Sequence, residues 1–226
     1  MHSIEQLGVL QSQASGGQSS IAAGSRADRP EVEHPIILTH PVTGARSLLY
    51  VRTSVANHLS DIAASQPDLV LTTLQRWKQS GRLTDEHFAF IARGALRNRL
   101  KEGWPPAYAI LGYAHDAPIA LTPLTLERTE LRDGDTLNFS AALTATTTAP
   151  VHVMIVIATT GQNGQPREKV SFLRRATAEA DQELRLAKAH PLRSTARWKV
   201  SPGSYSLALQ VNGRRFPSVA FTVLNT

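Results

Sequence analysis

Cysteine is absent from this sequence of 226 residues, and long hydrophobic runs are absent as well. Without cysteine there can be no disulfide bond, no cysteine-based zinc or iron–sulfur site and no thiol nucleophile. No segment approaches the ~18 to 20 consecutive apolar residues that cross a bilayer, and the N-terminal stretch lacks the basic start and apolar core of a secretory signal. These absences predict a cytoplasmic protein without membrane contact.

Acidic residues are in the minority. The chain has 24 Lys and Arg against 18 Asp and Glu, which gives a net charge of +6 and a pI near 10.1. Such a balance suits a polyanionic partner such as nucleic acid, although many basic proteins bind none. The charge therefore admits DNA or RNA as a partner without requiring either.

Apolar residues recur at helical spacing in residues 48–117. Breaks at Pro67 and Gly81 divide this region, which predicts about two helical hairpins whose third helix covers residues 84–103. Ahead of it, residues 1–47 include the polar run QSQASGGQSS and are predicted to be largely disordered or irregular.

From residue 118 to residue 226 the apolar residues alternate in twos, as in the segments 137–143 and 151–157. Asn212-Gly213 is the strongest short hairpin signal in the chain. About seven short strands in this length predict an immunoglobulin-like antiparallel β-sandwich. The predicted fold class is therefore α + β with two domains, a short helical array followed by the sandwich.

Particular stretches then resemble a known family. YVRTSVANHLSDIAASQPDLVLTTLQRW and IARGALRNRLKEGWPPAYAILGY are similar to consecutive HEAT-like repeats of DNA alkylation repair proteins, the AlkC/AlkD type of DNA glycosylase. EKVSFLRRATAEADQELRLAKAHPLRSTARWKVSPGSYSLALQVNGRRF resembles the C-terminal immunoglobulin-like domain of the AlkC branch. The two similarities occur in the family's order along the chain.

The resemblance implies hydrolysis of the N-glycosidic bond of cationic N-alkylated bases in double-stranded DNA, without a cofactor or metal. A monomer with a cytoplasmic, nucleoid-associated location is expected. Family members carry several further repeats upstream, so the chain is interpreted as truncated or rearranged at its N-terminus. Stacked repeats need neighbours to bury both faces. The alternative function is a catalytically inactive DNA-binding remnant.

Asp61 is the catalytic candidate that the resemblance suggests. Loss of a cationic base needs no general acid, but it needs negative potential beside the deoxyribose as oxocarbenium character develops. Asn57 lies four residues earlier, on the same helical face, where it orients a water, the carboxylate or a phosphate. The alternative for Asp61 is a solvated carboxylate without a catalytic role, and the alternative for Asn57 is a structural amide that bonds to neighbouring backbone. A metal site is not expected, because only His58 and Asp61 are suitably spaced.

Basic residues on both predicted domains are the candidates for DNA contacts. Arg93, Arg97 and Lys101 recur every four residues, and Arg52 flanks Asn57. Such a stripe binds phosphates without reading sequence, while its alternative is a solvated helix face. In the sandwich the candidates lie in the middle strands and their loops, with a merely basic surface as the alternative: Lys169, Lys188, Arg193, Arg197 and Lys199.

Overall fold

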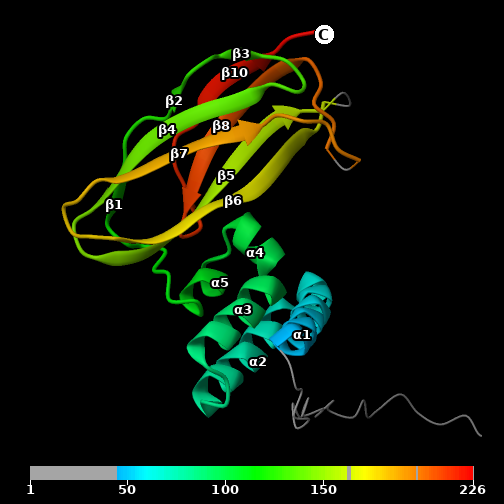
Figure 1. The fold of residues 1–226 in the computed structure, drawn as a ribbon, viewed down its shortest axis with the longest axis vertical. Coiled ribbons are helices and arrows are strands. Elements are labelled where there is room, and N and C mark those ends of the chain that lie inside the picture. Colours follow the sequence, from blue (N-terminus) through cyan, green and yellow to red (C-terminus); the bar gives the residue numbers. More distant parts are fainter. Residues whose placement is uncertain (1–44, 162–163, 197, 226) are drawn as a thin grey trace, which may run out of the picture. The chain divides into compact units, whose positions relative to one another are not determined.

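The computed structural model describes residues 45–161, 164–196 and 198–225. Within these ranges five helices precede ten strands (Figure 1). The predicted irregular segment 1–47 falls almost wholly outside the described residues, apart from the first turn of the first helix. The helices are α1 (Ala45–Ser65), α2 (Pro67–Ser80), α3 (Asp85–Ala95), α4 (Arg97–Glu102) and α5 (Pro105–Ala109).

Local signals set the ends of the long helices. Pro67 occupies the first turn of α2, where its fixed φ suits the helix and its missing N–H costs nothing. Gly81 ends α2 with φ 63°, a left-handed conformation that glycine adopts without a steric penalty. Thr84 begins α3, because its side-chain oxygen accepts a hydrogen bond of 3.3 Å from the backbone N–H of His87.

The predicted single helix over residues 84–103 is wrong in one respect. The chain leaves helical geometry at Leu96, with φ −98° and ψ 15°, so that α3 and α4 are separate helices. Leu96 is fully buried, and its position in the core coincides with the break. Arg93 and Arg97 therefore do not share one continuous helical face.

The helical core depends on a close approach of α1 and α3. A Cβ atom on Gly94 would lie 2.7 Å from the Cβ of Ala56, which is closer than real side chains pack. Small residues at these two positions let the helix backbones approach. The core itself consists of Val55, Leu59, Val70, Leu74, Phe88, Ile91, Leu96, Leu100, Tyr108 and smaller neighbours.

The strands form two packed sheets, as the fold class predicts. One sheet has four strands, with β4 paired to β1, β2 and β7, and the other has the order β3-β10-β8-β5-β6, with β9 paired to β8. The strands are β1 (Ile119–Leu121), β2 (Thr125–Leu126), β3 (Glu130–Leu131), β4 (Thr136–Ala145), β5 (Ala149–Thr160), β6 (Pro166–Ala178), β7 (Leu184–Pro191), β8 (Gly203–Val211), β9 (Arg214–Arg215) and β10 (Val219–Val223).

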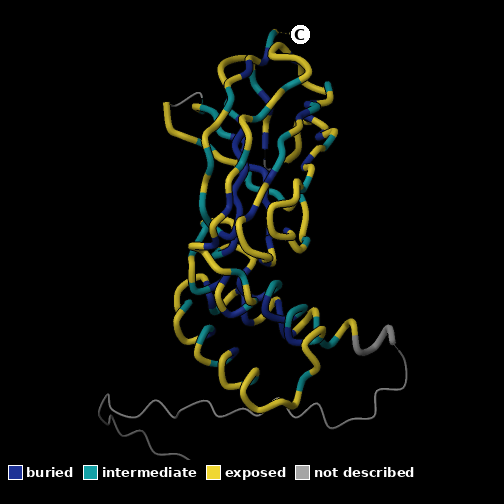
Figure 2. Tube along the Cα trace, turned by 90° about the vertical axis from the view of Figure 1, so that its left-hand side faces the viewer, coloured by how far each residue is buried: buried dark blue, intermediate teal, exposed yellow. Residues whose placement is uncertain are grey.

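The sandwich departs from a purely antiparallel arrangement at one edge. β3 and β10 are parallel, whereas every other pairing between the named strands is antiparallel. The hairpin predicted at Asn212-Gly213 is confirmed, with positive φ at both residues, and it joins β8 to β9. Figure 2 shows the buried residues gathered inside the sandwich and among the helices.

Strand β5 is buried on both faces. Val151, Val153, Ile155 and Ile157 point into the sandwich core, whereas Met154 packs with the helical core. The helices and the sandwich belong to one compact unit. The sandwich therefore contributes its outer sheet face to the core that the helices share.

Candidate nucleic-acid interface

Asn57 and Arg97 are brought together by the packing of α1 beside α4. The guanidinium of Arg97 donates a hydrogen bond of 3.0 Å from Nη1 to Oδ1 of Asn57. Both residues are exposed, and Asp61 is exposed one turn further along α1. The predicted catalytic pair thus lies on the surface of α1, with a guanidinium held next to the amide.

Arg52 packs against a ring of α3. Its guanidinium lies 5.3 Å from the centre of the Phe90 ring, which is a cation–π geometry. The side chain is half-buried. Arg52 therefore has a packing role in the helical part, and a phosphate contact remains a prediction.

Arg93 and Lys101 complete the predicted basic stripe, but their surroundings differ. Burial and the positive charge of Arg175 lower the pKa of Arg93, and Tyr113 opposes that shift. Lys101 is exposed on α4. Arg93 on α3 therefore has Arg175 of β6 in its electrostatic surroundings, whereas Arg97 contacts Asn57 of α1.

The sandwich candidates divide between two places. Lys169 on β6 and Lys188 on β7 both lie close enough to His190 to lower its pKa, although burial is the larger cause and the value falls to about 4. Arg193 and Lys199 are exposed in the segment between β7 and β8. Arg197 lies outside the described residues.

Lys199, one of the candidate cations of the sandwich, has Asp133 as an acidic neighbour. Hydrogen bonds from Ser194 are the main cause that holds the pKa of Asp133 below its ordinary value, and the positive charge of Lys199 contributes to it. The backbone N–H of Ser194 donates to Oδ1 of Asp133 at 3.0 Å. Part of the positive potential of this loop is therefore offset by Asp133.

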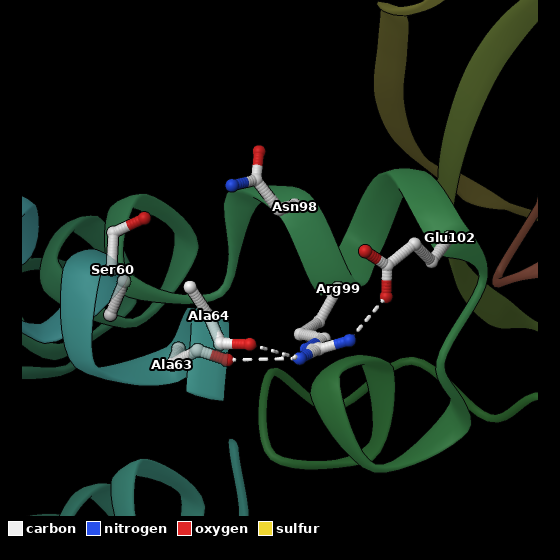
Figure 3. A pocket seen from close by; sticks show the side chains of 7 residues that line it. Ser60, Ala63, Ala64, Asn98, Arg99 and Glu102 are labelled. Atoms are coloured by element: carbon white, nitrogen blue, oxygen red, sulfur yellow. Dashed lines mark hydrogen bonds and ion pairs between the residues drawn. The ribbon is translucent and has the colours of Figure 1, made fainter. Parts of the chain in front are cut away.

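A cavity of about 230 Å³ lies between α1 and the α3–α4 segment (Figure 3). Arg99 spans it, donating to the carbonyl oxygens of Ala63 and Ala64 at 3.0 and 3.1 Å and to Glu102 at 2.7 Å. These three hydrogen bonds engage the guanidinium of Arg99 within the protein. A ligand in the cavity would therefore meet mainly small side chains. Its lining residues are Ser60, Ala63, Ala64, Ala95, Asn98, Arg99 and Glu102, and Asp61 is not among them.

The sequence patterns did not indicate the polar groups between helices and sandwich. Nε2 of Gln210 on β8 donates to the carbonyl oxygen of Leu100 and to the hydroxyl of Tyr108. His152 on β5 is 3% exposed, and its pKa falls to about 4 because of burial and the charges of Arg175 and Arg93. A polar residue within an apolar strand was the only signal available for either position.

The described residues contain no group of three or more His, Asp or Glu side chains placed to hold a metal ion. Among the same residues, no helix combines the length and apolar character needed to cross a bilayer. These two findings concern only the part of the chain that the structure describes.

A helical part followed by an immunoglobulin-like sandwich is the fold that this chain shares with the matched part of an AlkC-type protein. Residues 120–225 match the family described as "Uncharacterised protein YhaZ, C-terminal Ig-like domain". The chain is 27% identical over 175 residues to the uncharacterized protein YhaZ of Bacillus subtilis (strain 168), covering 77% of this chain and 48% of that protein.

A solved structure shows the same likeness in three dimensions. The alkylpurine DNA glycosylase AlkC of Pseudomonas fluorescens, bound to DNA containing an abasic site analog, matches with a TM-score of 0.71 and 30% identity over 78% of this chain. The match covers 49% of the AlkC chain. The present chain thus spans about half the length of both relatives, and its similarity lies with the AlkC/YhaZ family.

Proposed function

We propose that this chain binds double-stranded DNA as part of the repair of alkylated bases. The observation that carries the proposal is the likeness to AlkC, a glycosylase whose structure contains DNA. The net charge of +6 and the exposed cations Arg97, Lys101, Arg193 and Lys199 supply the positive potential that phosphates require.

The helical part would bind the DNA backbone through Arg97. Its hydrogen bond to Asn57 restricts the guanidinium while leaving the residue exposed, so less side-chain entropy is lost when a phosphate binds. Phosphate contacts of this kind fix the position of a duplex without reading its sequence. Lys101, one turn further along α4, would extend the same contact.

Base removal would use the carboxylate of Asp61. The bond between the deoxyribose C1′ and the base nitrogen breaks, the bonding electrons leave with the cationic base, and water then adds to C1′ and loses a proton. Asp61 would stabilise the developing positive charge on the sugar. Because Asp61 is exposed, this effect depends on DNA displacing water from the carboxylate.

The exposure of Asp61 also favours a second candidate, binding without catalysis. The cavity between α1 and the α3–α4 segment is not lined by Asp61, so an extruded base held in this cavity would not lie beside the carboxylate. A chain with this surface alone would hold duplex DNA and leave the glycosidic bond intact.

Release of free base from methylated duplex DNA distinguishes the two candidates. The purified chain is incubated with the duplex, and binding to the same duplex is titrated at several salt concentrations. We expect Asp61→Asn to abolish any base release, whereas Asp116→Asn, an exposed carboxylate between α5 and β1, leaves it unchanged.

Each result has a defined meaning. Release that depends on Asp61 supports the glycosylase, and salt-sensitive binding without release supports DNA binding without catalysis. Failure to bind duplex DNA at low salt contradicts both. The monomeric state and the cytoplasmic, nucleoid-associated location stay predictions.

A further inference from the structure

A β-bulge sets which side chains of β6 face the helices. In the β5–β6 ladder, Val153 pairs with Arg174 and Met154 pairs with Phe172, so the register skips Leu173. Simple alternation would place Arg174 on the same face as Phe172. The bulge places Arg175 there instead, opposite His152.

Aromatic rings then run from the interior to the surface at this point. The ring of His152 lies 5.4 Å from that of Tyr113 and 5.4 Å from that of Phe172. His152 is 3% exposed, whereas Phe172 is 44% exposed and is one of the few large apolar side chains that lie at the surface in the described part of the chain. The ring of Phe172 therefore packs on its inner side against His152, which packs against Tyr113, and its other side is exposed to solvent.

Two guanidinium groups lie in the neighbourhood of these rings. Arg175 lies 5.1 Å from the centre of the Phe172 ring. The charge of Arg175 acts on Arg93 of α3, and the charges of both arginines act on the buried His152. Among the described residues, no carboxylate forms an ion pair with Arg93 or Arg175. Two neighbouring positive charges without a carboxylate, one of them half-buried and the other exposed, favour an anion.

We propose that Arg93, Arg175 and Phe172 form a nucleotide site at the junction of the helices and the sandwich, where both guanidinium groups bind one DNA phosphate and the Phe172 ring packs against the adjoining nucleotide. This junction site rests on the proposed binding of duplex DNA and specifies where one phosphate is held. Its arginines come from α3 and β6, so the bound phosphate bridges the two parts.

Guanidinium groups next to an exposed aromatic ring suit this ligand. Arginine binds phosphate oxygens in a bidentate geometry, and an aromatic or apolar side chain packs against sugar or base. A free inorganic anion would use the arginines and gain nothing from Phe172. The contribution of the ring therefore separates a nucleotide from a simple anion.

The bulge supplies a matched control within one strand. Arg174 and Arg175 are adjacent and both exposed, but Nη1 of Arg174 donates to the carbonyl oxygen of Arg185 on β7.

Affinity for a 20-base-pair duplex is measured by fluorescence anisotropy between 50 and 200 mM salt, a range over which phosphate contacts change affinity strongly. Thermal melting of each variant verifies that it is folded.

Arg175→Ala is expected to weaken duplex binding about 5- to 10-fold and to reduce the salt slope by about one. Phe172→Ala is expected to weaken it by about 3- to 10-fold with the slope unchanged, since no charge is lost. Arg174→Ala should change affinity less than about 2-fold. Equal losses for Arg174→Ala and Arg175→Ala in a protein that binds DNA would overturn the junction site and leave the proposed function standing.

Side-chain NMR gives a second, local readout. The Nε–H signals of Arg93 and Arg175, assigned from their Ala variants, are followed during titration with the duplex and, separately, with inorganic phosphate at equal ionic strength. Shifts of both signals with duplex support the site. Shifts with inorganic phosphate alone would overturn it in favour of a free-anion site, and a wild-type chain that binds no duplex would refute the proposed function itself.

Discussion

Gln210 on β8 and Tyr108 on α5 are both fully buried and are joined by a hydrogen bond of 2.9 Å from Nε2 to the phenolic oxygen. The Tyr108 hydroxyl in turn donates to the carbonyl oxygen of Leu100 at 2.7 Å. Burial raises the pKa of Tyr108 to about 12, although the hydrogen bond from Gln210 acts against that shift. This buried contact connects the sandwich to the helices.

Tyr108→Phe and Gln210→Leu are each expected to lower the free energy of unfolding by about 1 to 2 kcal/mol, because each removes hydrogen bonds from a buried group. The double variant should lose less than the sum, since the two side chains share one bond. Urea denaturation of the four proteins measures the coupling. Strict additivity would mean that the bond does not contribute to stability.

Gly94→Ala should destabilise the helical part by about 1 to 3 kcal/mol, because the new methyl group overlaps the Cβ of Ala56 on α1. Ala56→Gly in the same chain should restore part of the loss by removing the clashing atom. Thermal melting monitored by circular dichroism is the measurement. A Gly94→Ala protein as stable as the wild type would show that α1 and α3 separate easily.

Acid should destabilise the fold through two buried histidines. The pKa values of His152 and His190 fall from 6.5 to about 4 in the folded chain, chiefly because of burial. The unfolded chain therefore binds protons between pH 6.5 and 4 while the folded chain does not, so stability is present above pH 6.5 and is lost as the pH falls toward 4. Removal of one histidine should abolish about half of this histidine-dependent loss.

His152→Gln tests this pH dependence. The free energy of unfolding is compared between pH 7 and pH 4.5 in the variant and the wild type. We expect the wild type to lose roughly 2 to 3 kcal/mol more than the variant over that range. Parallel pH profiles for the two proteins would contradict the assignment of a neutral His152.

Arg97 and Arg99 should have opposite roles although they are two residues apart. Arg97→Ala is expected to weaken binding to any duplex sequence about equally, with little effect on stability, because the guanidinium is exposed. Arg99→Ala should lower the free energy of unfolding by about 1 to 3 kcal/mol, because it releases the carbonyl oxygens of Ala63 and Ala64. Anisotropy titrations and denaturation curves of both variants measure the two effects, and a reversed pattern would exclude Arg97 from the interface.

Several features of this chain follow from its sequence alone. Pro67, Gly81 and Thr84 mark helix ends, and Asn212-Gly213 marks a hairpin, because each acts through its own backbone or that of a residue within one turn. Alternation predicted the inward face of β5 for the same reason, since side-chain direction in a strand has a period of two.

Other features were decided by packing between distant segments. The break at Leu96, which separates Arg93 from Arg97, and the bulge that brings Arg175 beside Phe172 leave no signal in the spacing of residues. The second buried face of β5 likewise exists only because the helices pack on it. The sequence thus determined several helix ends, a hairpin and the inward face of β5 through local backbone chemistry. Contacts between α1, α3 and the β5–β6 pair decided the surroundings of the candidate cations.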